Sequence, residues 1–288
     1  MALSLLSQLL HSCPVEDFYD AYYEKKYLQI KSANSCLFQF NTEMFKVALL
    51  KSAFTHPENI RANKEGNVYI APLPMEPYQL YDWAMEKYNN GATLILNQVE
   101  LNDDLSKQFA IDLGKDMKAY ISLTAFLTPE NSQGFSPHFD THDVFVMQMS
   151  GSKEWHIGDF EIELATRRQG FLVSPEVMNS PHTIISMFDN DILYLPRGMV
   201  HWAFAEHLPS LHVTVDIDSV TYSDLLLELI LQTSLNMTSK ENKMIVNLFQ
   251  RDFNGNLIPE LEEVLKNLKF ETKLFNLVLE KKAKIRYL

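Results

Sequence analysis

The chain has 288 residues, of which 46% are hydrophobic and 11% aromatic, and its formal net charge is −12. This composition predicts one large folded domain, alone or with an appendage, and excludes a disordered chain. The acidic charge argues against direct binding of DNA or RNA, because neutralising phosphates requires clustered Lys and Arg. It is compatible with a basic protein or peptide as substrate.

The N-terminal 119 residues alternate between helical and strand patterns. Pro14 and Asn41 are helix-start signals, Gly91 is a helix-end signal, and Asn102 is placed to cap the helix whose Leu105, Phe109, Leu113 and Met117 share one face. We expect helices at 3–11, 14–26, 42–54, 78–91 and 103–119, and strands at 27–32, 67–74 (an edge strand stopped by proline) and 92–99. Residues 55–67 are polar and are expected to form a loop.

Residues 120–217 have a different texture. Short runs rich in β-branched and aromatic residues are separated by loops that contain Gly, Pro, Asn or Ser, a pattern typical of an antiparallel sandwich or barrel. Strands are expected at 120–128, 144–149, 154–160, 170–174, 182–187, 191–196, 201–206 and 211–217. The predicted fold is therefore mainly β, with α/β elements before the core.

The last part of the chain, 219–288, returns to helical patterns. Ser223, Thr238 or Ser239, and Pro259 are the start signals of three helices. Their apolar residues, among them Leu225, Leu229, Leu231 and Leu235, exceed a single stripe, which favours a homodimer interface over helices that only cover one face of the sheet.

Two H-x-[DE] triplets occur, and composition alone predicts about one by chance. His56 and Glu58 lie in a polar loop without further candidate ligands. His138 and Asp140 precede the apolar run VFVMQM and are expected to enter that strand, where residues two apart project to the same side.

A facial iron site requires two His and one carboxylate, so a third ligand is needed. His201 follows the Pro-Arg-Gly turn in DILYLPRGMVHWAF and starts another predicted strand. The residues thus predict a metal site made by His138, Asp140 and His201.

The stretch SQGFSPHFDTHDVFVMQMSGSKEW, followed by DILYLPRGMVHWA and SLHVTV, resembles the Jumonji-C hydroxylases, and among these the cupin-like ribosomal oxygenases, which hydroxylate protein side chains. The resemblance implies a double-stranded β-helix (cupin or jelly-roll) core at about 120–217 within a domain of residues 1–218, and a helical, dimer-forming region at 219–288. It also implies an Fe(II) enzyme that uses 2-oxoglutarate and O₂.

Within this resemblance, His138, Asp140 and His201 bind the iron, and Lys153 receives the distal carboxylate of 2-oxoglutarate as a point charge with three donors. The family often has Tyr or Asn where this chain has Phe126, so Thr124 or Thr214 is expected to supplement Lys153.

Other polar and aromatic residues near these motifs have expected roles outside iron and 2-oxoglutarate binding. His142 is either a residue beside the ligands or on the substrate side, or a neutral surface residue, and Asp143 is expected to be a structural carboxylate. We expect His212 to be a satisfied core histidine and Arg197 an exposed turn residue. Trp155, Trp202, Met147 and Met149 are expected to be packing residues.

The functional hypothesis is a dioxygenase that hydroxylates a side chain of a protein or peptide. Demethylation of an N-methyl group by the same chemistry and a non-catalytic cupin interaction protein are the alternatives. The cellular location is predicted from the absence of three sequence features. Cys13 and Cys36 make no disulfide framework, residues 1–18 read as an amphipathic helix without a signal peptide's basic region, and no run approaches 18 apolar residues. We therefore expect a cytoplasmic protein.

Overall fold

The computed structural model describes residues 4–31, 37, 39–166, 173–221, 224, 225, 227, 228 and 272–285. Two compact units divide the chain, Met1–Asp218 and Ser219–Leu288. In the first unit the helices are α1 (Leu5–Leu10), α2 (Val15–Ala21), α3 (Thr42–Thr55), α4 (Pro77–Asn89) and α5 (Asp104–Met117). Its strands are β1 (Leu28–Ile30), β2 (Ile60–Lys64), β3 (Asn67–Ile70), β4 (Thr93–Leu96), β5 (Ala119–Thr128), β6 (Ser132–Gln133), β7 (Asp143–Ser150), β8 (Lys153–Phe160), β9 (Thr183–Met187), β10 (Ile192–Leu195), β11 (Met199–Ala205) and β12 (Ser210–Ser219).

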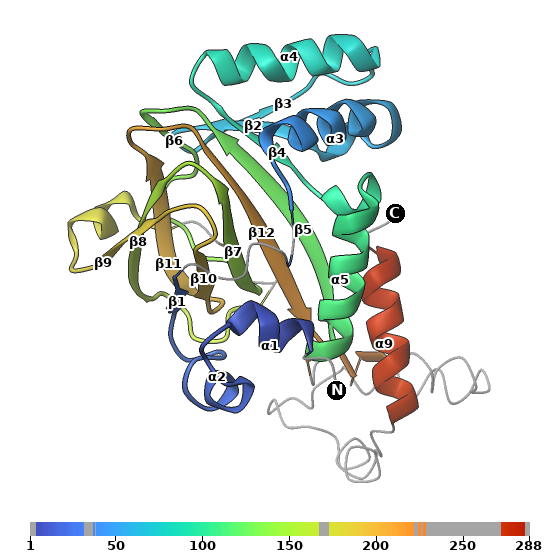
Figure 1. The fold of residues 1–288 in the computed structure, drawn as a ribbon, viewed down its shortest axis with the longest axis vertical. Coiled ribbons are helices and arrows are strands. Elements are labelled where there is room, and N and C mark those ends of the chain that lie inside the picture. Colours follow the sequence, from blue (N-terminus) through green and yellow to red (C-terminus); the bar gives the residue numbers. More distant parts are fainter. Residues whose placement is uncertain are drawn as a thin grey trace, which may run out of the picture. The chain divides into compact units, whose positions relative to one another are not determined.

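The strands of the described residues form two antiparallel sheets. An eight-stranded sheet has the order β1-β10-β7-β12-β5-β4-β2-β3, and a four-stranded sheet has the order β6-β11-β8-β9. Figure 1 shows β5 and β12 side by side and the small sheet across from β7 and β10. The jelly-roll core predicted from the sequence is confirmed.

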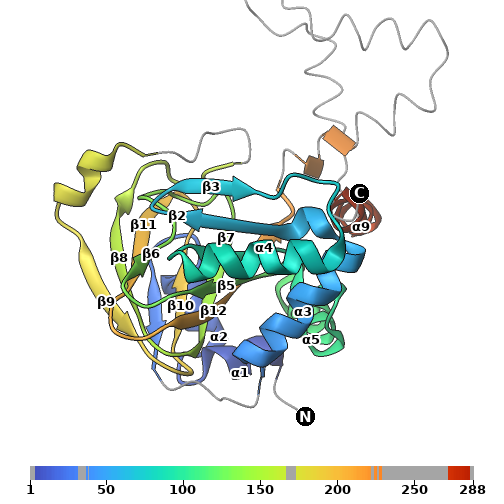
Figure 2. The ribbon, with the colours of Figure 1, turned by 90° about the horizontal axis from the view of Figure 1, so that it is seen from above.

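The apolar run of β7 is explained by burial on both faces. Val144 and Val146 pack between the sheets with Trp155 of β8, whereas Phe145 and Met147 pack under the helices. Successive side chains of a strand point to opposite faces of the sheet. When both faces are covered, all of these side chains are buried, and the sequence is continuously apolar. Figure 2 shows α3 and α5 on the side of the large sheet away from β8 and β9.

Helix ends follow ordinary capping chemistry. The Asn41 side chain accepts from the Met44 backbone N–H at the start of α3, as predicted. For α5 the predicted cap is wrong by one residue, since Asp103 accepts from Ser106 while the amide of Asn102 donates to Ser52 Oγ. Leu105, predicted on the buried face of α5, is 62% exposed.

Residues 55–67, predicted to be a loop, contain β2. This strand pairs with β3 on one side and β4 on the other, and Ala62 and Asn63 are fully buried. Its polar composition hides it, because the strand is ordered by pairing with the neighbours on both sides and its own residues carry no strand pattern. The two-residue strand β6 is also absent from the prediction, and the strand expected at 170–174 lies mostly outside the described residues.

The second unit contains α9 (Thr272–Ile285) and the described residues of 224–228. Lys281 Nζ lies 2.7 Å from both carboxylate oxygens of Glu228, and Lys282 Nζ lies 2.8 Å from Asp224 Oδ2. Leu229, Leu231 and Leu235, on which the dimer prediction depends, lie outside the described residues. In the part of the chain that the structure describes, every helix is too short or too polar to cross a membrane.

Candidate functional site

His138 and Asp140 lie in the segment between β6 and β7, so the prediction that they enter a strand is wrong. His138 instead forms an isolated antiparallel bridge with His201, which lies inside β11. The His138 N–H donates to the His201 carbonyl at 3.1 Å, and the His201 N–H donates to the His138 carbonyl at 2.8 Å. This bridge brings together residues that are far apart in the sequence.

Each histidine of the bridge is oriented by its own backbone. His138 Nδ1 donates to the Ser136 carbonyl at 2.9 Å, and His201 Nδ1 donates to the Met199 carbonyl at 3.0 Å. Because a carbonyl only accepts, the proton must be on Nδ1 in both rings. In the neutral form of each ring Nε2 then keeps its lone pair, which is the arrangement that metal-binding histidines use.

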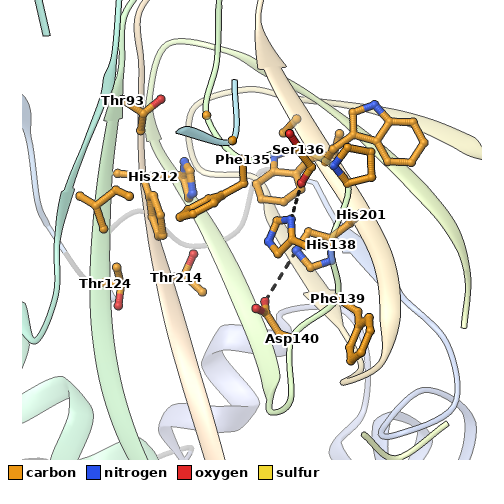
Figure 3. A pocket seen from close by; sticks show the side chains of 18 of the residues that line it. Thr93, Thr124, Phe135, Ser136, His138, Phe139, Asp140, His201, His212 and Thr214 are labelled. Carbon is orange, nitrogen blue, oxygen red and sulfur yellow. Dashed lines mark hydrogen bonds and ion pairs between the residues drawn. The ribbon is translucent and has the colours of Figure 1, made fainter. Parts of the chain in front are cut away.

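A ligand atom from each of His138, Asp140 and His201 lies within 4.8 Å of the others. His201 Nε2 is 3.6 Å from Asp140 Oδ2, and Figure 3 shows the three side chains directed toward one another. Two imidazoles and one carboxylate on one side of a cavity form a donor set that suits Fe(II) and leaves coordination positions open.

The protonation states fit this role. Burial, and then the charge of His138, lower the pKa of His201 to about 4, so this ring is neutral near pH 7. Burial opposes the ionisation of Asp140, but the imidazoles of His201, His142 and His138 together outweigh it and lower the pKa of the carboxyl. The set thus offers the neutral ring nitrogen of His201 and the carboxylate of Asp140 at neutral pH.

Gly198 positions the Asp140 backbone, since its N–H donates to the Asp140 carbonyl at 2.8 Å. Its φ is +84°, and a Cβ at this position would lie 1.8 Å from the Ile162 carbonyl oxygen. We predict that Gly198→Ala lowers the free energy of unfolding by about 2 kcal/mol or more. Gly158→Ala is the matched control, because its Cβ would meet only ordinary contacts at 3.5 Å and beyond. Chemical denaturation measures both; equal small losses would contradict the account.

The three side chains open onto a cavity of about 680 Å³ between the two sheets (Figure 3). Lys153, at the start of β8, lines it and is 5% exposed. Its ammonium donates to Thr128 Oγ1 at 3.0 Å, and burial lowers its pKa to about 7. Among the described residues no carboxylate forms an ion pair with it. A buried amine without a counter-charge is placed to receive an anion.

Residues 101–225 match the family model described as JmjC domain. This region contains the triad, Lys153 and every strand from β5 to β12. We call residues 101–225 the JmjC domain after this match.

Curated relatives with this domain are longer than the chain. It is 27% identical to the bifunctional lysine-specific demethylase and histidyl-hydroxylase NO66 of Dictyostelium discoideum over 218 residues, which are 73% of this chain and 42% of that protein. Identity to ribosomal oxygenase 1 of Bos taurus is 25% over 260 residues, 88% of this chain and 38% of the relative. The chain thus spans less than half the length of these relatives.

Among solved structures, the ribosomal oxygenase YcfD of Escherichia coli in complex with cobalt and 2-oxoglutarate has a TM-score of 0.60 and 16% identity. The match covers 92% of this chain and 69% of YcfD. This likeness shows a shared fold, and it extends beyond the JmjC domain to the N-terminal elements.

Within the JmjC domain, the two threonines predicted from the sequence lie on the cavity wall. Thr124 Oγ1 donates to Asp216 Oδ2 at 3.3 Å, and Thr214 lines the cavity on β12. The threonine that contacts Lys153 is Thr128, which the sequence analysis missed. Thr124 and Thr128 are four apart on β5, and the strand period of two was the signal that could have found it.

The JmjC domain also contains a polar cluster at Asp216, another residue that the analysis missed. Its Oδ1 lies 3.0 Å from His142 Nε2, and its Oδ2 accepts from Ser122 and Thr124. His142 is 22% exposed and lines the cavity, which supports the interpretation that places it beside the ligands.

Asp143 and Arg197 belong to a buried structural network. Asp143 Oδ1 accepts from the Tyr194 hydroxyl at 2.7 Å, and burial raises its pKa to about 6. The Arg197 guanidinium contacts Glu24 as well as Asp143 and is 13% exposed, so the prediction of an exposed turn arginine is wrong. This network attaches the segment after α2 to the JmjC core.

Proposed function

We propose that the protein is an Fe(II)- and 2-oxoglutarate-dependent dioxygenase that hydroxylates a side chain of a protein or peptide. The observation that carries the proposal is the convergence of His138, Asp140 and His201 on one side of a cavity that also contains the ammonium of Lys153, which has no carboxylate partner among the described residues. The names of the relatives support hydroxylation of a protein. A non-catalytic cupin would have no use for this combination.

In this proposal, iron with 2-oxoglutarate and O₂ supplies the oxidant that inserts oxygen into a C–H bond of the substrate. His138, Asp140 and His201 hold the metal, with both histidines kept in one tautomer by the carbonyls of Ser136 and Met199. Lys153 holds the distal carboxylate, and Thr214 and Thr124 line the same space.

The pKa of Lys153 predicts that binding is linked to proton uptake. Near pH 8 a group with a pKa of about 7 is mostly neutral, and an arriving carboxylate restores its charge, so that protein loaded with Mn(II) takes up close to one proton with each 2-oxoglutarate. Near pH 6 the amine is already charged, and this uptake vanishes. Calorimetry in two buffers of different ionisation enthalpy measures the difference. The same uptake at both pH values would contradict the assignment.

A pool of basic and acidic peptides, incubated with the protein, Fe(II), ascorbate and 2-oxoglutarate, tests the reaction. We expect basic peptides that gain the mass of one oxygen, in a 2-oxoglutarate-dependent manner, because the chain is acidic. Loss of one methylene mass from N-methylated peptides would instead establish the demethylase alternative. The cytoplasmic location and the homodimer formed through 219–288 are part of the same proposal.

A further inference from the structure

His212 lies on the cavity wall formed by the large sheet and is 3% exposed. Its ring stacks on Phe126 of β5, with centroids 4.7 Å apart and planes 5° apart, and meets the Trp155 ring edge-on at 5.5 Å. Figure 3 shows it with Thr93 and Thr214, across the cavity from His138 and His201. Two aromatic neighbours at right angles hold the plane of the imidazole in one orientation.

The hydrogen bonding of this ring is incomplete. Its Nδ1 is buried and has no hydrogen-bond partner among the described residues, so the prediction of a satisfied core histidine is wrong. Burial, and then the positive charge of Lys153, lower its pKa well below the usual value, so the ring is neutral and carries one N–H donor. An unmatched buried polar atom costs free energy, and one that faces a cavity can be satisfied by a bound ligand.

Lys153 also has hydrogen-bond donors without an assigned acceptor among the described residues. Its ammonium carries three donors, and the described structure assigns one of them, to Thr128 Oγ1. Both side chains line the same cavity and contact the same ring, because Trp155 lies 5.9 Å from Lys153 Nζ and 5.5 Å from the His212 ring, measured to its centroid. A neutral N–H beside an ammonium matches an anion with two oxygens, because each oxygen receives its own donor.

We propose that His212 and Lys153 together form a two-donor carboxylate site, in which a ring N–H of His212 donates to one oxygen of the ligand's carboxylate and the ammonium of Lys153 donates to the other. The identity of the ligand as 2-oxoglutarate rests on the proposed function. His212 thereby takes the place of a hydrogen-bonding residue at Phe126, which stacks on the imidazole instead. The pair selects 2-oxo acids that carry a second carboxylate.

Calorimetry on the full chain loaded with Mn(II) tests this with 2-oxoglutarate as the probe. His212→Phe keeps an aromatic ring against Phe126 but removes the donor, and we expect its Kd to rise about tenfold or more. His212→Asn, which restores an N–H, should recover most of the affinity. His207→Phe is the control on an 85% exposed histidine and should bind as the wild type does.

A second ligand separates binding from packing. 2-Oxobutyrate lacks the distal carboxylate, so His212→Phe should not change its affinity, nor that of Mn(II). Equal losses for both ligands would show a structural role and overturn the proposal, as would unchanged 2-oxoglutarate binding by His212→Phe. Absence of 2-oxoglutarate binding by the wild type would instead overturn the proposed function, and the carboxylate site with it.

Discussion

His138→Ala is expected to weaken Mn(II) binding by more than about a hundredfold and to abolish conversion of 2-oxoglutarate into succinate. The change removes one of three ligands, and mutations even of residues that only support a ligand cost up to about a hundredfold in metal affinity. The effect on metal binding should exceed the loss of stability, because among the described residues the ring makes one hydrogen bond, to the Ser136 carbonyl.

His56→Ala is the matched control for this experiment. His56 belongs to the other H-x-[DE] triplet, and its Nδ1 lies 3.5 Å from Glu58 in a partly exposed pair. An exposed pair of this kind contributes little, so metal binding and turnover should remain unchanged. Equal effects of the two alanine variants, or Mn(II) affinity retained by His138→Ala, would contradict the assignment of the metal site.

Lys153→Met is expected to weaken 2-oxoglutarate binding by about a hundredfold while leaving Mn(II) affinity unchanged. Removing one partner of a buried charge pair leaves the ligand's carboxylate without its counter-ion. Lys115→Met, which changes a 68% exposed lysine, should have no effect on either affinity. Calorimetry measures all four values, and unaltered 2-oxoglutarate binding by Lys153→Met would remove this lysine from the site.

The same change should stabilise the ligand-free protein. Burial lowers the pKa of Lys153 from 10.5 to about 7, so the unfolded chain binds a proton that the folded chain releases, and stability rises as the pH increases between these values. Methionine removes this penalty. Lys153→Met is thus expected to raise the free energy of unfolding by about 1–4 kcal/mol below pH 7, a gain that fades toward pH 10.5. Denaturant melts at several pH values measure it.

The cluster of His138, Asp140 and His201 was predictable because its sequence signals are local. His138 and Asp140 are two apart, His201 follows a Pro-Arg-Gly turn, and the surrounding motifs resemble a known family. Even so, the mechanism of convergence differs from the prediction. The residues meet through one isolated backbone bridge between His138 and His201, and such a long-range pairing leaves no periodic signal in the sequence.

The parts that the sequence analysis missed depend on sheet register. Lys153 reaches Thr128, and His142 reaches Asp216, only after strands distant in the chain are paired and two sheets face each other. Strand β2 was missed for a similar reason, since its polar residues become ordered between two neighbours. Most helix ends, by contrast, were readable to within a residue or two, because capping is a local interaction.

The most direct test of the account is calorimetric titration of the wild-type chain with 2-oxoglutarate, with and without Mn(II). The account predicts saturable binding at one site per chain that requires the metal, since the ligand must contact both the triad and Lys153. Binding of 2-oxoglutarate without Mn(II) at undiminished affinity would separate the triad from the carboxylate site. Failure of the chain to bind either the metal or 2-oxoglutarate would contradict the proposed oxygenase.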